Sequence, residues 1–334
     1  MTVMNVRNAR RPRRRLISTA ATVAATAVGL VGLSACSSSD AADGKGGGNG
    51  GKLDVVASFY PMQYLAEQIG GDHVSVRNLT EPGQEPHDLE VSAKQRAQLE
   101  ESDVAVYLKG LQPSVDEAID QSGISTKVDA ASLTELEKHG SEVGGHADEH
   151  DDHDHDHGGE EGTDPHIWLD PVKYTEVAEG VGKALEKADP DHAADYKKNT
   201  AALVAKLDAL NTKFEDGLKN TDSKVFITTH AAFGYLAERY GLTEEAISGL
   251  DPESEPSAAR VKDLQKMAKA DGVTTVFYET LVSDKTAKTL AGDAKLKTDV
   301  LDPIEGITEK SKGTDYLQVM EANLSALQKA LGAK

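Results

Sequence analysis

Short apolar runs alternate with amphipathic stretches along most of this 334-residue chain. Residues 53–58 (LDVVAS), 103–108 (DVAVYL) and 224–229 (KVFITT) have the length and composition of buried strands. Apolar residues at helical spacing follow such runs, as in residues 60–69. Alternating strands and helices favour parallel sheets covered by helices, because a parallel crossover needs a connection of helix length. The pattern therefore predicts an α/β fold with parallel-type sheets in two (β/α) lobes.

The same pattern predicts the remaining elements of both halves. Further strands are expected at residues 74–79, 127–129, 245–248, 274–278 and 298–301. Further helices are expected at residues 92–101, 113–122, 172–187, 232–240, 257–270, 284–290 and 315–331.

One predicted helix is much longer than the others and lies between the two halves. It runs from residue 191 to about residue 217, and at about 1.5 Å per residue it would be roughly 40 Å long. Its apolar positions form a single stripe, made of Tyr196, Leu203, Leu207, Leu210, Phe214 and Leu218. A rod of this length with one apolar face is expected to brace two lobes.

The N-terminus has the layout of a secretory signal. Six arginines between residues 7 and 15 precede an apolar stretch at residues 16–33, and small residues follow at Leu33-Ser34-Ala35-Cys36. The last four residues resemble a bacterial lipobox, in which the cysteine is lipidated, and Cys36 is the chain's single cysteine. We expect a protein that is secreted and lipid-anchored to the outer face of the cell membrane. An ordinary cleaved signal with an unrelated cysteine is the alternative, and the export route stays open.

The charge balance excludes one large class of partners. Lys and Arg number 36 against 56 Asp and Glu, a formal charge of −20, which becomes −26 without the six arginines of the signal. A chain this acidic is not expected to bind nucleic acid, whose phosphates repel it. It would instead concentrate cations near its surface, although a solvated acidic surface is also common.

A tract rich in histidine and aspartate points to metal. His146, His150, His153, His155 and His157 alternate with carboxylates, and the tract has no large apolar side chain to bury, so it cannot form a core element. Imidazole suits zinc, copper and nickel. We expect a flexible loop that captures metal weakly, the alternative being an acidic loop in which histidine is incidental.

Three histidines outside the tract occupy positions suited to a fixed metal site. His87 follows the second predicted strand, His166 follows the tract, and His230 ends KVFITTH. Ligand sites in open α/β sheets form at the carboxyl ends of strands, and residues 301–305 (LDPIE) offer carboxylates at another such end. Three imidazoles and one carboxylate make a suitable zinc shell. The other histidines, His73, His139 and His192, are expected in exposed polar turns.

Four ordered motifs resemble the metal-binding lipoproteins of bacterial ABC importers for zinc and manganese, of the zinc-uptake type. The motifs are Glu-Pro-His-Asp at 85–88 with Ser92-Ala93, Asp-Pro-His-Ile-Trp at 164–168, Thr-His-Ala-Ala-Phe-Gly-Tyr at 229–235, and Gly-Leu-Asp-Pro-Glu-Ser-Glu-Pro-Ser at 249–257. The resemblance covers the chain from Leu53 onward. It implies two α/β lobes joined by a rigid backbone helix, with the metal in the cleft between them.

The resemblance also implies the ligands. They fall on His87, His166, His230 and an acid near the last strand, for which Glu305 is the first choice, Asp302 the second and Glu279 the third. Relatives of the manganese type carry an acid where this chain has His230, so Zn²⁺ is expected rather than Mn²⁺. The implied partners are an ABC transporter permease and its ATPase, and the protein itself is expected to be a monomer.

These readings divide the chain into seven predicted segments: a lipoprotein signal (1–35), a Gly- and Ser-rich tether (36–52), an N-terminal lobe (53–138), the His/Asp-rich loop (139–163), the second-ligand segment with a helix (164–190), the connecting helix (191–219) and a C-terminal lobe (220–334). A carrier is preferred to an enzyme, because four protein ligands leave no position for an activated water and neither His-Glu-x-x-His nor Gly-x-Ser-x-Gly occurs. A secreted zinc hydrolase, a manganese carrier and a surface adhesin are the alternatives.

Overall fold

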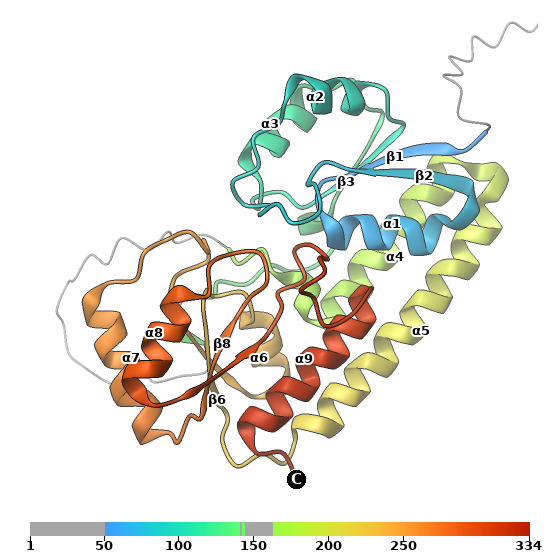
Figure 1. Cartoon of the computed structure of the whole chain (residues 1–334). Helices are drawn as coiled ribbons and strands as arrows, with labels where there is room; N and C mark the ends of the chain where they lie inside the picture. Colours follow the sequence, from blue (N-terminus) through green and yellow to red (C-terminus); the bar gives the residue numbers. More distant parts are fainter. Residues whose placement is uncertain (1–50, 141, 144–162) are drawn as a thin grey trace, which may run out of the picture. The chain divides into compact units, whose positions relative to one another are not determined.

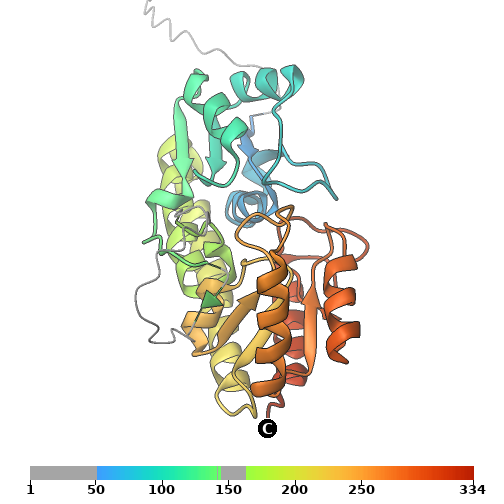
Figure 2. The ribbon, with the colours of Figure 1, turned by 90° about the vertical axis from the view of Figure 1, so that its left-hand side faces the viewer.

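The structure is a computed structural model that describes residues 51–140, 142–143 and 163–334. Cys36, the predicted signal and the five histidines of the tract lie outside these ranges. The described residues belong to one compact unit and form two open sheets with helices on both faces of each (Figures 1 and 2). This arrangement confirms the predicted fold class. Among the described residues, no helix combines the length and the apolarity that crossing a bilayer requires.

The N-terminal sheet contains four parallel strands in the order β2-β1-β3-β4. The strands are β1 (Leu53–Ala57), β2 (Val74–Asn78), β3 (Val104–Tyr107) and β4 (Thr126–Asp129). Alternate residues of β1 and β3 enter different cores, because successive side chains of a strand point to opposite faces. Val55 and Val104 pack on the side of α1 (Tyr60–Gly70), whereas Val56 and Ala105 pack against α2 (Ala93–Glu100) and α3 (Pro113–Gln121).

The C-terminal sheet has the order β5-β7-β6-β8-β9. Four of its strands are parallel: β6 (Val225–Thr228), β7 (Thr243–Ala246), β8 (Thr275–Tyr278) and β9 (Lys297–Val300). The fifth, β5 (Glu142–Val143), is antiparallel to β7 and lies within the segment predicted as a loop. A strand of two residues carries no readable hydrophobic period, so the sequence pattern missed it.

Helices cover both faces of the C-terminal sheet as well. Phe226 and Phe277 share a core with α6 (Gly234–Tyr240) and α9 (Tyr316–Leu331). Ile227 and Val276 face the opposite way, against α7 (Ala258–Ala270) and α8 (Lys285–Ala294). Both faces of the sheet are therefore covered by helices, as is usual for parallel sheets.

Two helices connect the sheets. Helix α4 (Pro171–Ala188) packs along α5 (Ala193–Leu218), the long helix that the apolar stripe predicted, and both views show the two side by side (Figures 1 and 2). Helix α5 also contacts α1 of the N-terminal half and α9 of the C-terminal half. All six stripe residues are buried, so α5 is anchored to both halves along one face. Short 3₁₀ turns complete the chain at Gly71–His73, Ala130–Ser132, Ile167–Leu169 and Pro190–His192.

Candidate metal centre

Four side chains from distant parts of the sequence converge on one point: His87, His166, His230 and Glu305. One nitrogen or oxygen of each lies within 4.8 Å of the corresponding atoms of the other three. His87 lies in the loop after β2, His230 lies two residues beyond β6, and Glu305 lies in the loop after β9. Three of the four thus come from segments that leave the carboxyl ends of parallel strands. The three histidines and the first-choice acid of the sequence prediction are brought together.

The Glu305 carboxylate is the common contact of the three imidazoles. Its Oε1 lies 3.3 Å from Nε2 of His87 and 3.5 Å from Nε2 of both His166 and His230. The Nε2 atoms of His166 and His230 are 3.4 Å apart. His166, His230 and Glu305 are buried, whereas the His87 side chain keeps 12% of its surface exposed. All three rings therefore direct Nε2 at the same point, and His87 lies on the side that solvent reaches.

A carboxylate fixes the orientation of His166. Asp164, two residues earlier, accepts hydrogen bonds through Oδ1 from Nδ1 of His166 at 2.7 Å and from its backbone N–H at 2.9 Å. A ring that donates its Nδ1 proton presents the lone pair of Nε2 to a metal. The Asp-Pro-His sequence thus contains both the ligand and the group that orients it.

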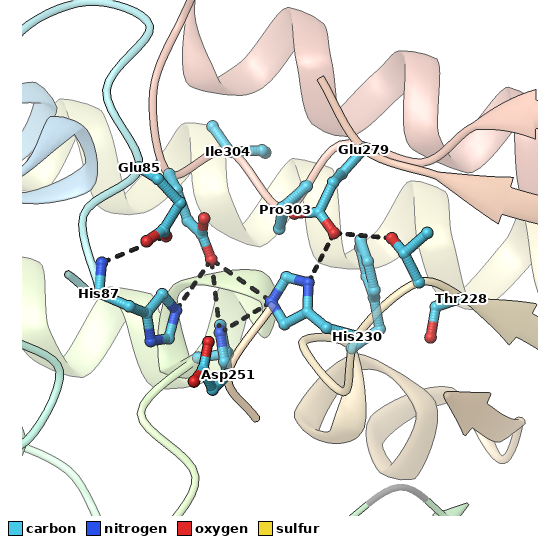
Figure 3. Close-up of polar contacts among 12 residues, drawn as sticks. Glu85, His87, Thr228, His230, Asp251, Glu279, Pro303 and Ile304 are labelled. Carbon is cyan, nitrogen blue, oxygen red and sulfur yellow. Dashed lines mark hydrogen bonds and ion pairs between the residues drawn. The ribbon is translucent and has the colours of Figure 1, made fainter. Parts of the chain in front are cut away.

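A second carboxylate has the same relation to His230. Oε1 of Glu279, at the end of β8, lies 2.8 Å from Nδ1 of His230 and accepts the hydroxyl of Thr229 at 2.6 Å. Figure 3 shows the rings of His87 and His230 turned toward the space between them, with Glu279 on the opposite side of the His230 ring. Glu279, the third choice for the fourth ligand, therefore faces the wrong nitrogen to join the group in this geometry.

The turn after β9 decides between the two nearest acids. The Asp302 carboxylate accepts the backbone N–H of Ile304 at 2.9 Å and the hydroxyl of Thr280 at 3.2 Å. Ile304 adopts a φ of 61°, which is rare and strained for a β-branched residue, and the turn delivers Glu305 to the three imidazoles. Asp302 thus closes the turn, and Glu305 faces the histidines.

The single tryptophan ties this turn to the His166 segment. Trp168 Nε1 donates to the backbone carbonyl of Pro303 at 2.6 Å, and its own carbonyl accepts the hydroxyl of Tyr316 on α9 at 2.6 Å. Trp168 is fully buried and its ring contacts that of Phe59 edge-on, with the centroids 4.9 Å apart. The position of Glu305 therefore depends on packing contributed by both halves of the chain.

The electrostatics of the group follow from burying acids and imidazoles together. Burial by itself would lower the pKa of His230, but the carboxylates of Glu279 and Glu305 hold that pKa well above its ordinary value. Burial would also lower the pKa of His166, but Asp164 and the hydrogen bond to Glu305 outweigh burial and raise that pKa. Burial would raise the pKa of Glu305, yet hydrogen bonds from the three imidazoles keep it well below its usual range. A divalent cation would replace the protons that now offset these buried carboxylates.

Glu85 lies near the group and was not among the site residues predicted from the sequence. Its carboxylate accepts the backbone N–H groups of His87 and Asp88, and Figure 3 shows it above the His87 ring. Burial and the neighbouring Glu305 charge raise the pKa of Glu85 to about 8. Its place directly before Pro86-His87 in the first motif was the sequence feature that could have identified it.

The prediction of an exposed polar turn is wrong for His139. Its side chain is 7% exposed, and Nδ1 lies 2.8 Å from Oδ2 of Asp164, the same carboxylate that orients His166. Its partners, Asp164 and Glu238, are 25 and 99 positions away in the sequence, so no local pattern could predict its burial. His73 and His192 are half-buried and stack on each other with ring centroids 4.0 Å apart.

Chemically, the group supplies three imidazole nitrogens and one carboxylate oxygen at a single point. This donor set suits a tetrahedral borderline-soft cation such as Zn²⁺ better than Mn²⁺, which favours oxygen-rich shells. Each buried imidazole has a carboxylate on its other nitrogen, which is the usual second layer around metal-binding histidines.

Comparison with known proteins gives consistent matches over most of the chain. The model of the family described as zinc-uptake complex component A, periplasmic, matches residues 55–330. The zinc-binding lipoprotein AdcA of Streptococcus pneumoniae serotype 4 is 38% identical over 288 residues, which cover 83% of this chain and 56% of AdcA. The high-affinity zinc uptake system protein ZnuA of Bacillus subtilis strain 168 is 37% identical over 290 residues, covering 85% of this chain and 89% of that protein.

A solved structure agrees with these matches. The crystal structure of the Zn(II)-bound ZnuA-like domain of Streptococcus pneumoniae AdcA superposes with a TM-score of 0.68 at 36% sequence identity, covering 84% of this chain and 99% of that domain. The chain thus spans the ZnuA-like domain but only about half the length of whole AdcA.

Proposed function

This chain belongs to the family of zinc-uptake complex component A, and we propose that it captures Zn²⁺ outside the cytoplasm and delivers it to an ABC-type importer. In this proposal His87, His166, His230 and Glu305 are the four ligands. The observation that carries it is the convergence of three Nε2 atoms on one carboxylate oxygen at 3.3–3.5 Å. Zinc is preferred to manganese because three of the four donors are imidazoles.

The donor set favours a carrier over a hydrolase. A catalytic zinc keeps one coordination position open for water, whereas four protein donors complete a tetrahedral shell. The Glu305 carboxylate occupies the position that a zinc-bound water would need, and it is fully buried. Metal-binding transport is the shared property of the family, and the absence of catalysis in this chain is part of our proposal.

The place of action and the partners are also proposed. AdcA is named a lipoprotein, and the lipobox-like Leu33-Ser34-Ala35-Cys36 supports a lipid anchor on Cys36 and a position at the outer face of the cell membrane. The zinc would pass to a membrane permease that a cytoplasmic ATPase drives. The five tract histidines would collect zinc weakly beside the fixed ligands, and the seven segments predicted from the sequence remain our proposed division of the chain.

Metal titration of the purified protein tests the ligand assignment. The full mature chain should bind one tight equivalent of Zn²⁺ by competition calorimetry, and Mn²⁺ should not displace it. His87→Ala, His166→Ala and His230→Ala should each weaken that equivalent by at least about 100-fold, since a four-ligand shell loses one donor. His73→Ala is the matched control, because its ring pairs with Asp195 far from the group, and it should leave the tight equivalent unchanged. Tight zinc binding that survives all three substitutions would contradict the assignment.

A second experiment tests delivery to the importer. Cells in which this protein is the sole zinc-uptake component of its kind should fail to grow under zinc chelation when they carry the His230→Ala form, and added zinc should rescue them. Equal growth of both strains under chelation would show that the zinc bound by this protein is not passed inward.

A further inference from the structure

A second cluster of potential metal ligands lies beside the first group. Glu137, His139 and Glu238 each place one ligand-capable atom within 4.8 Å of those of the other two. Glu137 and His139 lie just before β5, and Glu238 lies on α6. None of the three belongs to the four-residue group described above. The cluster combines one imidazole with two carboxylates, a donor set that binds divalent transition ions.

The imidazole of this cluster is held in a shaped pocket. A Cβ added to Gly234, the first residue of α6, would lie 2.6 Å from the His139 ring, so only glycine leaves room for the ring at this position. The Tyr235 ring meets His139 edge-on, with the centroids 4.6 Å apart. Tyr235 also donates its hydroxyl to the Asp164 carbonyl and accepts the Glu137 backbone N–H. Packing therefore fixes both His139 and the start of the segment that carries Glu137.

The orientation of His139 directs one nitrogen at a glutamate of the cluster. Nδ1 lies 2.8 Å from Oδ2 of Asp164, a fully buried carboxylate that can only accept at that distance. Nε2 then lies 3.1 Å from Oε2 of Glu238. In the protonated ring both nitrogens donate to these carboxylates, whereas in the neutral ring Nε2 keeps a lone pair. A cation at Nε2 would take the place of the proton that otherwise lies between Nε2 and Glu238. Metal-binding histidines share this pattern of a carboxylate on the far nitrogen.

The surrounding charges also favour a cation. Glu137, Glu238 and Asp164 provide three carboxylates against one nearby ammonium, that of Lys173, which lies 2.7 Å from Oε1 of Glu137. Lys173 is held elsewhere too, donating to the Glu135 carbonyl at 2.8 Å and lying 5.0 Å from the centre of the Tyr235 ring. It can therefore release Glu137 to a cation without losing its remaining contacts.

A surface hollow gives access to the cluster. The hollow has a volume of about 220 Å³, room for a hydrated ion, and it is lined by Glu137, Asp170, Lys173, Tyr235, Glu238 and Arg239. The Arg239 guanidinium is paired with Asp170 at 2.6 Å, and this carboxylate offsets its charge. Glu238 is largely exposed and closes the cluster from the solvent side.

From these contacts we propose that Glu137, His139 and Glu238 form a second divalent-cation site of lower affinity, linked to the four-residue group through Asp164. The cation binds Nε2 of His139 and one oxygen from each glutamate, with water completing the shell. Asp164 joins the two sites because Oδ1 accepts from His166 while Oδ2 accepts from His139. Each imidazole thereby keeps its Nδ1 proton on Asp164 and its Nε2 for metal. The affinity is lower because only three protein donors contribute and Lys173 competes for one of them.

Calorimetry on the full mature chain tests the second site. The five tract histidines are replaced by asparagine so that they contribute no equivalent, and one equivalent of Zn²⁺ is bound first. Further titration with Zn²⁺ should show a second, weaker equivalent. Glu238→Gln should weaken it at least tenfold, while Glu117→Gln, the same change at an exposed position on α3, should leave it unaltered. Lys173→Gln should tighten it, because Glu137 loses its competing partner.

Two results would overturn the proposal. One is a tract-substituted chain that takes up a single equivalent of Zn²⁺ and no more. The other is a second equivalent with equal affinity in the Glu238→Gln and Glu117→Gln forms. Two-dimensional NMR of the histidine rings adds a direct readout, since the second equivalent should shift Nε2 of His139, a resonance identified by its loss in His139→Gln. The first equivalent is measured separately, so failure of the second site leaves the proposed carrier function standing.

Discussion

Replacing Glu279 by glutamine should weaken zinc binding, and by an amount that depends on pH. Glu279 makes no contact with the proposed metal position, but its Oε1 accepts from Nδ1 of His230 at 2.8 Å and from the Thr229 hydroxyl at 2.6 Å. Glutamine keeps the shape of the side chain and offers a neutral oxygen in place of the charged one. The substitution therefore removes charge behind His230 with little change in packing.

The size of the effect follows from the contact that changes. A carboxylate behind a metal-binding imidazole increases the basicity of the ring, and loss of such a partner costs about 10- to 100-fold in metal affinity. That factor corresponds to about 1.4–2.8 kcal/mol, which agrees with the value of about 1.5–3 kcal/mol for a hydrogen bond to a charged group. Glu279 is buried, so solvent screens this interaction little.

The pH dependence has a definite sign. Burial would lower the pKa of His230, but Glu279, together with Glu305, holds it well above the ordinary value, so protons compete with zinc for this ring. Glutamine lowers that pKa and thereby relieves the competition. The deficit in affinity should be largest at high pH, where no proton competes in either form, and should shrink as the pH falls through the raised pKa of the unsubstituted protein.

Competition calorimetry between pH 6 and 9 measures both quantities. Glu244→Gln is the matched control, because Glu244 is another buried acid of the same sheet and its carboxylate hydrogen-bonds to Thr228 and the Phe233 backbone, not to the His230 ring. Its charge acts on His230 only through space, so this control separates loss of the hydrogen bond on Nδ1 from loss of a nearby charge. Burial raises the pKa of Glu244 to about 7, so glutamine resembles its protonated form. An unchanged affinity in Glu279→Gln, or a deficit that grows toward low pH, would refute the reasoning.

Three further outcomes are expected. Glu305→Gln should weaken zinc binding about 100-fold or more, whereas Asp302→Asn should mainly lower the melting temperature, because Asp302 closes the turn and Glu305 faces the imidazoles; equal losses of affinity in calorimetry would contradict this. Zinc binding at neutral pH should release protons, because neighbouring carboxylates outweigh burial and raise the pKa values of His166 and His230. Calorimetry in buffers of different ionisation enthalpy measures this release, and a heat independent of the buffer would contradict it. Trp168→Phe should lower the free energy of unfolding by about 1–3 kcal/mol in urea denaturation, because a buried backbone carbonyl loses its donor; an unchanged midpoint would count against that role.

Much of this fold can be predicted from local sequence patterns. The apolar stripe of α5 was readable because a helix repeats its buried face every 3.6 residues, and all six predicted stripe residues are buried. Strands β1, β3 and β6 were recognisable as short apolar runs, since parallel strands covered on both faces are rich in apolar residues. Among the strands that the structure describes, β5 alone was not predicted, because a pairing of two residues with β7 is too short to show a side-chain period.

The sequence by itself also determined three of the converging residues: His87, His166 and His230 were recognisable from motifs and from their places after strands or after the tract. Tertiary structure decided the fourth. Asp302 and Glu305 are both acids in the same short segment, so the sequence does not show which one meets the histidines. In the structure the turn with Ile304 at a φ of 61° places Asp302 where it caps the turn and Glu305 where it faces the imidazoles. The burial of His139 was likewise hidden, because Asp164 and Gly234 reach it from distant segments. Local periodicity specifies which residues are buried, whereas the contacts of polar side chains depend on how separate segments pack.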